Sequence, residues 1–233
     1  MLGKQVIGLR RRKYAVLLAL LVVALAVDTF HARSGAEQLR SDALRTVLAI
    51  AIWIVVFERP RERAAMAAVL LASLAINWGR HFIATNLDYA LSLADQAVMS
   101  LFLWIAVYAI LRDLFRTPTI GAENVLGAIC GYLIAGNAWG HINAIAYLLA
   151  PAAYSINPEL AGFLPDWHGR TALFTYYAFS QVMTIGYSDV TPVGAPATTL
   201  SLFAALFGMF YTAVVVSQFV GLAQKPRVEF PKQ

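Results

Sequence analysis

The sequence predicts an all-α integral membrane protein, and three observations lead to this fold class. First, 60% of the 233 residues are hydrophobic and 13% are charged, with a mean hydropathy of +0.65. Soluble domains are instead about 45–50% apolar and about 25% charged. Second, long apolar runs recur along the chain. Third, Lys and Arg gather in alternate connections between these runs. A disulfide scaffold is excluded, because Cys130 is the single cysteine.

The apolar runs define the expected membrane helices. A helix crosses about 30 Å of hydrocarbon with about 17–25 residues. Segments of this kind lie at 14–31, 42–57, 64–80, 90–111, 124–150 and 196–222. They predict a cytoplasmic N-terminal segment (1–13), a four-helix transmembrane unit (14–111), a cytoplasmic linker (112–123), a second membrane domain (124–222) and a cytoplasmic tail (223–233).

The distribution of basic residues predicts the orientation. Thirteen Lys and Arg lie on the side reached by even numbers of crossings, and five lie on the opposite side or in the adjoining span ends. This bias places both termini in the cytoplasm and the chain in the cell inner (plasma) membrane. The net charge of +5 is therefore a topology signal, and no nucleic-acid partner is expected. The N-terminal span also resembles a signal peptide, but its apolar run continues past Ala26, so we interpret it as a span.

The apolar pattern breaks between residues 151 and 196. Residues 151–169 are typical of an exposed loop, and residues 170–183 predict an apolar helix too short to cross the bilayer. Residues 184–192 then return the chain to the outer surface. Extended backbone at membrane depth is tolerated only where it is buried in protein or lines a water-filled path. This arrangement favours a pore; the alternative is an interfacial helix and loop on the outer surface.

The segment Thr184-Ile185-Gly186-Tyr187-Ser188-Asp189 resembles the selectivity filter of the potassium channel family, Thr-Val-Gly-Tyr-Gly-Asp. That filter is also the general example of carbonyl-based ion selectivity. Tyr176 and Tyr177 stand where many members have paired aromatics, and Thr191-Pro192 follow at the family spacing. Further similarity lies in the flanking spans, at Tyr132 to Trp139, Val214 to Leu222, and Gly208, where the family often has a hinge glycine. The resemblance covers residues 124–222, and the two flanking segments resemble the outer and inner helices of bacterial members with four additional N-terminal spans.

The resemblance implies a pore domain over 124–222, with outer helix, re-entrant pore helix, filter and inner helix, assembled as a homotetramer. Potassium ions would bind at carbonyls of Thr184, Ile185, Gly186, Tyr187 and Ser188. The physical requirement is a row of carbonyls on one side of the chain, which needs left-handed conformations at alternate residues. Gly186 meets that need without steric cost. One chain supplies one wall, so a closed pore implies a symmetric ring.

Ser188 departs from the family, which has glycine there. A left-handed non-glycine residue costs about 1–2 kcal/mol, or about 4–8 kcal/mol in a tetramer. Either neighbouring packing supports that strain, or the chain relaxes and the outermost ion site changes. We expect the second, with potassium preference kept but weakened.

Several residues are expected to support the filter. The resemblance implies that Asp189 bonds to an aromatic of the pore helix, and we expect Tyr177 to be that partner. Tyr176 and Ser180 complete the expected support, although Ser180 replaces a glutamate found in some members. Four glycines in the fifth span, Gly127, Gly131, Gly136 and Gly140, predict close packing of that span on the inner helix.

The charges in the first four spans do not predict a voltage sensor, which needs several Arg on one face of the fourth span. Residues 90–111 contain none, and Asp95 is their only charge. We expect Arg45 to pair with Asp28 or Asp95 inside the four-helix unit.

The sequence therefore predicts a passive potassium channel without enzymatic activity or cofactor. Its partners are lipid, monovalent cations and copies of itself. Two alternatives stay open: a non-conducting regulatory or scaffold subunit that keeps the pore fold, and a non-selective monovalent cation channel.

Overall fold

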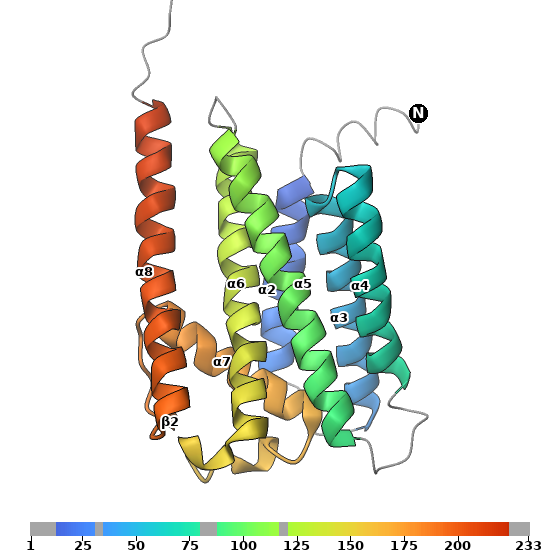
Figure 1. Ribbon diagram of the computed structural model, residues 1–233, viewed down its shortest axis with the longest axis vertical. Helices are drawn as coiled ribbons and strands as arrows, with labels where there is room; N and C mark the ends of the chain where they lie inside the picture. Colours follow the sequence, from blue (N-terminus) through green and yellow to red (C-terminus); the bar gives the residue numbers. More distant parts are fainter. Residues whose placement is uncertain (1–12, 31–34, 80–87, 117–120, 224–233) are drawn as a thin grey trace, which may run out of the picture.

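The computed structural model describes residues 13–30, 35–79, 88–116 and 121–223. Seven α-helices occupy these ranges. They are α2 (Lys13–Phe30), α3 (Gly35–Val56), α4 (Pro60–Gly79), α5 (Asp88–Arg116), α6 (Ala122–Leu149), α7 (Trp167–Val182) and α8 (Ala195–Ala223). The protein is thus all-helical apart from one short pair of strands, and its six long helices run in alternating directions through one bundle (Figure 1).

Three of these helices are long and apolar enough to cross a membrane over the described ranges. They are Tyr89–Arg116, Ala122–Leu149 and Ala195–Val220. The apolar part of α2, Lys13–Val27, is shorter. Helix α3 begins at Gly35 instead of the expected position 42, and α5 continues to Arg116 beyond the expected end at 111. The apolar helices and the high hydrophobic content of the chain together indicate a membrane protein.

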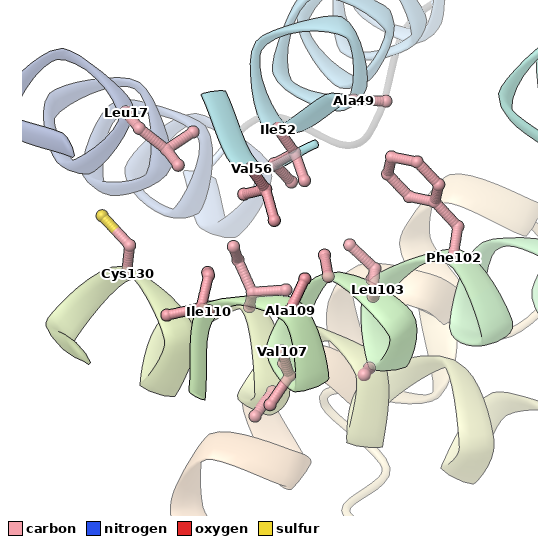
Figure 2. Close-up of a cluster of buried hydrophobic side chains, with 14 of the residues drawn as sticks. Leu17, Ala49, Ile52, Val56, Phe102, Leu103, Val107, Ala109, Ile110 and Cys130 are labelled. Carbon is pink, nitrogen blue, oxygen red and sulfur yellow. The ribbon is translucent and has the colours of Figure 1, made fainter. Parts of the chain in front are cut away.

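Helix α6 is the central element of the bundle. It packs against α2 and α5 on one side and against α7 and α8 on the other. One apolar core joins the N-terminal helices to α6, with Leu17 of α2, Ile52 of α3, Phe102 of α5 and Cys130 of α6 all nearly or fully buried (Figure 2). The N-terminal helices therefore share a core with the second half of the chain.

The glycines of α6 fit against three different neighbours. A Cβ on Gly140 would lie 2.7 Å from the Cα of Thr175 in α7, and Gly136 packs as closely against Phe179 of the same helix. Gly131 instead faces Tyr211 of α8, and Gly127 faces Tyr14 of α2. The expected packing of all four glycines on the inner helix is therefore found for one position, because the other three face α7 and α2.

Helix α8 stands at the edge of the bundle (Figure 1). A cluster of rings fixes it, because Phe207 lies 5.2 Å from Trp104 of α5 and 6.5 Å from Trp139 of α6 between ring centroids. Much of the remaining surface of α8 is apolar and exposed, at Leu202, Phe203, Met209, Phe210, Val214, Val216 and Val220.

Candidate functional site

Helix α7 is a short helix held inside the bundle. Its N-cap is Asp166, whose carboxylate accepts a hydrogen bond from the Gly169 N–H at 2.8 Å. At about 1.5 Å per residue its 16 residues extend about 24 Å, less than the hydrocarbon thickness of a bilayer. Phe174 and Tyr177 are buried against the neighbouring helices, and α7 occupies only the half of the bundle that also holds β2 (Figure 1).

The chain leaves α7 through a tight turn. The N–H groups of Ile185 and Gly186 both donate to the carbonyl oxygen of Ser180, at 2.8 and 3.1 Å. Thr184 has φ 56° and Gly186 has φ 70°, so two alternate residues are left-handed. A β-branched residue such as Thr184 adopts this conformation rarely, and outliers of this kind gather at functional sites.

Ser188 does not adopt the left-handed conformation. Thr184 is the one non-glycine residue with positive φ in the part of the chain that the structure describes. Of the two outcomes expected at Ser188, strain supported by packing or a relaxed backbone, the structure shows the relaxed backbone. The steric cost is instead located at Thr184.

A strand pair holds the chain after this turn. β1 (Tyr154–Ile156) pairs antiparallel with β2 (Val190–Pro192), in the register Ser155 to Thr191. The pairing continues through a hydrogen bond from the Asn157 N–H to the Asp189 carbonyl at 2.8 Å. Both ends of residues 184–189 are therefore anchored, one to α7 and the other to the loop that precedes it.

The partner of Asp189 is Tyr176, not Tyr177 as expected. The Tyr176 hydroxyl donates to Asp189 Oδ2 at 2.7 Å, and its ring stacks on Tyr187 with centroids 5.7 Å apart and planes 10° apart. The Tyr177 hydroxyl lies 2.6 Å from Ser201 Oγ of α8. Adjacent helical residues point about 100° apart, so Tyr176 faces the turn and Tyr177 faces the core.

Ser180 contacts the turn through its backbone. Its hydroxyl donates to the carbonyl of Tyr177 at 2.8 Å, within α7. The contribution of Ser180 to the turn is therefore its carbonyl oxygen, which accepts the two N–H groups of Ile185 and Gly186.

The turn is exposed on the surface of the single chain. Ile185 is 50% exposed and Tyr187 is 51% exposed, and residues 183–188 form a continuous exposed run. Gly208 lies nearby, in the middle of the unbroken helix α8, where a Cβ would overlap the carbonyl oxygen of Val182. Gly208 thus permits close contact between α8 and the end of α7.

The predicted ionic partners of Arg45 lie only partly within the described structure. The guanidinium of Arg45 sits 5.0 Å from the ring centroid of Trp167 in α7, a cation–π contact. Asp95 accepts a hydrogen bond from Ser73 at 3.4 Å, and the side chain of Asp28 lies outside the described residues. Both Arg45 and Asp95 line a cavity of about 60 Å³ between the N-terminal helices and α7.

Residues 144–225 match a family described as "Ion channel". The match begins near the end of α6 and includes the strand pair, α7, the turn at 184–188 and α8. No curated protein and no solved structure matches the chain. The family match supports passive ion channel function for this part of the protein.

Proposed function

We propose that the protein is a potassium-selective channel in which residues 184–188 form the selectivity filter. The observation that carries this proposal is the pair of alternate left-handed residues, Thr184 and Gly186, at the end of a short helix inside the ion channel match. An ordinary strand points successive carbonyls to opposite sides. Left-handed conformations at alternate residues supply the one-sided row of oxygens that replaces the hydration shell of K⁺.

The exposure of this row in a single chain supports assembly into a ring. The filter segment and the apolar face of α8 lie open on one flank of the chain. Apolar patches of this size mark contacts with lipid or with protein. A homotetramer covers them and closes the pore, with four filter segments around one axis. Conduction then requires neither enzymatic chemistry nor a cofactor, and the permeant ions and lipid are its other partners.

The proposed topology has six crossings with both termini in the cytoplasm. Its support is the alternating direction of the six long helices (Figure 1) together with the basic residues on one side of them. The filter then lies near the outer surface of the plasma membrane.

The relaxed backbone at Ser188 supports a weakened potassium preference, because fewer ordered sites remain in series. Substituting Ser188→Gly removes the cost of a left-handed conformation there, about 1–2 kcal/mol per subunit. We expect a larger K⁺ to Na⁺ permeability ratio in the variant, measured as the reversal potential in mixed salt. Identical ratios in both proteins would refute this effect, and equal permeabilities in the wild type would favour the non-selective alternative.

Potassium flux into liposomes tests the function itself. A Cβ on Gly186 has no neighbour within 4 Å, but alanine is strained at φ 70°. Gly186→Ala should therefore stop K⁺ uptake, while its strain of about 1–2 kcal/mol lowers the melting temperature in detergent by roughly 2–8 °C and leaves the protein folded. Gly162→Ala is the matched control, because Gly162 also has no neighbour within 4 Å and has no positive φ.

The expected result is saturating K⁺ uptake by wild type and Gly162→Ala, and uptake at the level of empty liposomes for Gly186→Ala. Equal uptake by all three proteins would show that ions do not pass the 184–188 segment. A folded wild-type assembly without uptake would favour the scaffold alternative.

A further inference from the structure

The outer half of α7 is attached to the N-terminal helices by polar side chains. His168 Nε2 lies 2.7 Å from Asp42 Oδ1 of α3. One turn further along α7, Thr171 Oγ1 accepts a hydrogen bond from Gln96 Nε2 of α5 at 2.7 Å. Two of the four N-terminal helices therefore hold the same helix that carries the proposed filter.

These polar contacts, called the α7 ties below, involve buried side chains, so breaking them is costly. Asp42 is 1% exposed, Gln96 0% and Thr171 2%. The amide oxygen of Gln96, Oε1, also has a partner, because it forms a hydrogen bond with Nδ1 of His141 in α6. A buried polar group that loses its hydrogen-bond partner destabilises the fold, because no water takes the place of that partner. The α7 ties therefore fix the position of α7 relative to α3, α5 and α6.

The opposite end of α7 controls the proposed filter. Tyr176 holds Asp189 and stacks on Tyr187, and the carbonyl of Ser180 holds Ile185 and Gly186. All these contacts come from one continuous helix, Trp167–Val182. One continuous helix therefore connects His168 to the contacts that hold the proposed filter.

His168 is the titratable member of the α7 ties. The charges that act on its ring are Asp42 and Arg45 of α3 and Asp166, whose Oδ1 lies 3.9 Å from Nδ1. Burial opposes protonation, as does Arg45, but the nearby Asp166 carboxylate and the hydrogen bond to Asp42 outweigh both and raise the pKa of His168. The side chain is 11% exposed, so a proton can reach it from the outer loop.

The raised pKa gives the sign of the effect. The ion pair of protonated His168 with Asp42 is fully present below the ordinary pKa of histidine, about 6.5. It is lost as the pH rises through the raised pKa of the folded protein. Acid on the outer side thus tightens the contact between α3 and α7, and alkali loosens it.

We propose that the four N-terminal helices regulate the filter as a proton sensor, in which His168 and Asp42 form the proton-dependent contact with α7. The proposal rests on the proposed channel function and deepens it. It gives these helices a role that needs no voltage-sensing arginines, of which residues 89–111 contain none.

The experiment compares full-length wild type with His168→Gln, Asp42→Asn and the control Glu159→Gln. Glutamine can still donate to Asp42 but does not titrate, and Glu159 is an exposed acid of the same outer loop. Each protein is measured in two ways between about pH 6 and about pH 9 on the outer side. One is the K⁺ to Na⁺ permeability ratio in liposomes, and the other is the melting temperature in detergent, which does not depend on conduction.

In wild type and Glu159→Gln we expect the permeability ratio to fall at least about fivefold as the outer pH rises, the lower end of typical coupling between sites. The melting temperature should fall in parallel. Both profiles should be flat in His168→Gln and shallower than in wild type in Asp42→Asn, where Asp166 still acts on His168. If the melting temperatures of wild type and His168→Gln change with pH in the same way, the proposed proton-dependent contact between His168 and Asp42 is wrong. This result does not depend on the flux measurement.

Two further outcomes separate this proposal from the channel proposal. A pH-dependent melting temperature with a pH-independent permeability ratio would overturn the regulation and leave the channel proposal intact. Absence of flux from every protein at every pH would overturn the channel proposal and, with it, the regulation.

Discussion

Gly208 offers a direct test of how α7 and α8 are packed. A Cβ added there would overlap the carbonyl oxygen of Val182 and lie 2.8 Å from its carbonyl carbon. Carbon atoms in contact normally stay about 3.5–4.0 Å apart, so Gly208→Ala must separate the two helices by about 1 Å. The same carbonyl accepts a hydrogen bond from the Tyr132 hydroxyl at 3.1 Å, which resists its displacement.

The magnitude follows from two opposing effects. Overpacking costs about 1–3 kcal/mol, and replacing a helical glycine by alanine returns up to about 1 kcal/mol. Because the overlap at Gly208 is with backbone atoms, the overpacking cost lies at the upper end of this range. The net destabilisation is then about 2 kcal/mol per subunit, which lowers the melting temperature by roughly 4–8 °C for a chain of this size. The assay is thermal unfolding in detergent, with Gly162→Ala as the control because its Cβ meets no neighbour.

A second measurement separates close packing from hinge motion at this glycine. If Gly208 were needed only for bending, Gly208→Ala would keep or raise the melting temperature and change flux alone. An unchanged or higher melting temperature would therefore refute the packing argument.

Two further predictions concern single contacts. Tyr176→Phe removes the hydrogen bond to Asp189, a charge-assisted bond of about 1.5–3 kcal/mol, and should reduce the K⁺ to Na⁺ permeability ratio more than Tyr177→Phe does; equal ratios in the two variants would contradict this. The hydrogen bond from Arg112 lowers the pKa of Glu62, so the pair stabilises the fold above the ordinary pKa of glutamate and is lost as the pH falls through the lowered value. Glu62→Gln should cost about 0.5–1 kcal/mol at neutral pH and progressively less as the pH falls through the lowered pKa of Glu62. A cost that stays constant in urea titrations across that acid range would count against the assignment.

The apolar helices of the second half were predictable because their pattern is uninterrupted. Residues 124–150 and 196–222 contain almost no charge, and the helices Ala122–Leu149 and Ala195–Ala223 cover nearly the same residues. The early start of α3 was missed because residues 35–41 are mostly polar, and an apolar run cannot show a helix that extends beyond it. Leu39 and Arg40 in this extension are exposed, so it is helical without belonging to the buried part of α3.

The partner of Asp189 could not be chosen from the sequence. Tyr176 and Tyr177 lie at almost the same distance along the chain from it, and the rotation of α7 about its own axis decides which hydroxyl reaches the carboxylate. The strand pair was missed as well, because three residues are too few to show an alternating pattern. The left-handed backbone of Thr184 could not be predicted either, because a β-branched residue type gives no sign of that conformation.

The most direct test of the central claim is a single-particle reconstruction of the full-length protein in lipid with K⁺ as the salt. A potassium channel built as proposed predicts four subunits around one axis, with ion density between the four copies of residues 184–188. The exposed apolar face of α8 should then lie against neighbouring subunits or the pore. Single subunits, or a ring without ions along the 184–188 segment, would contradict the proposed function.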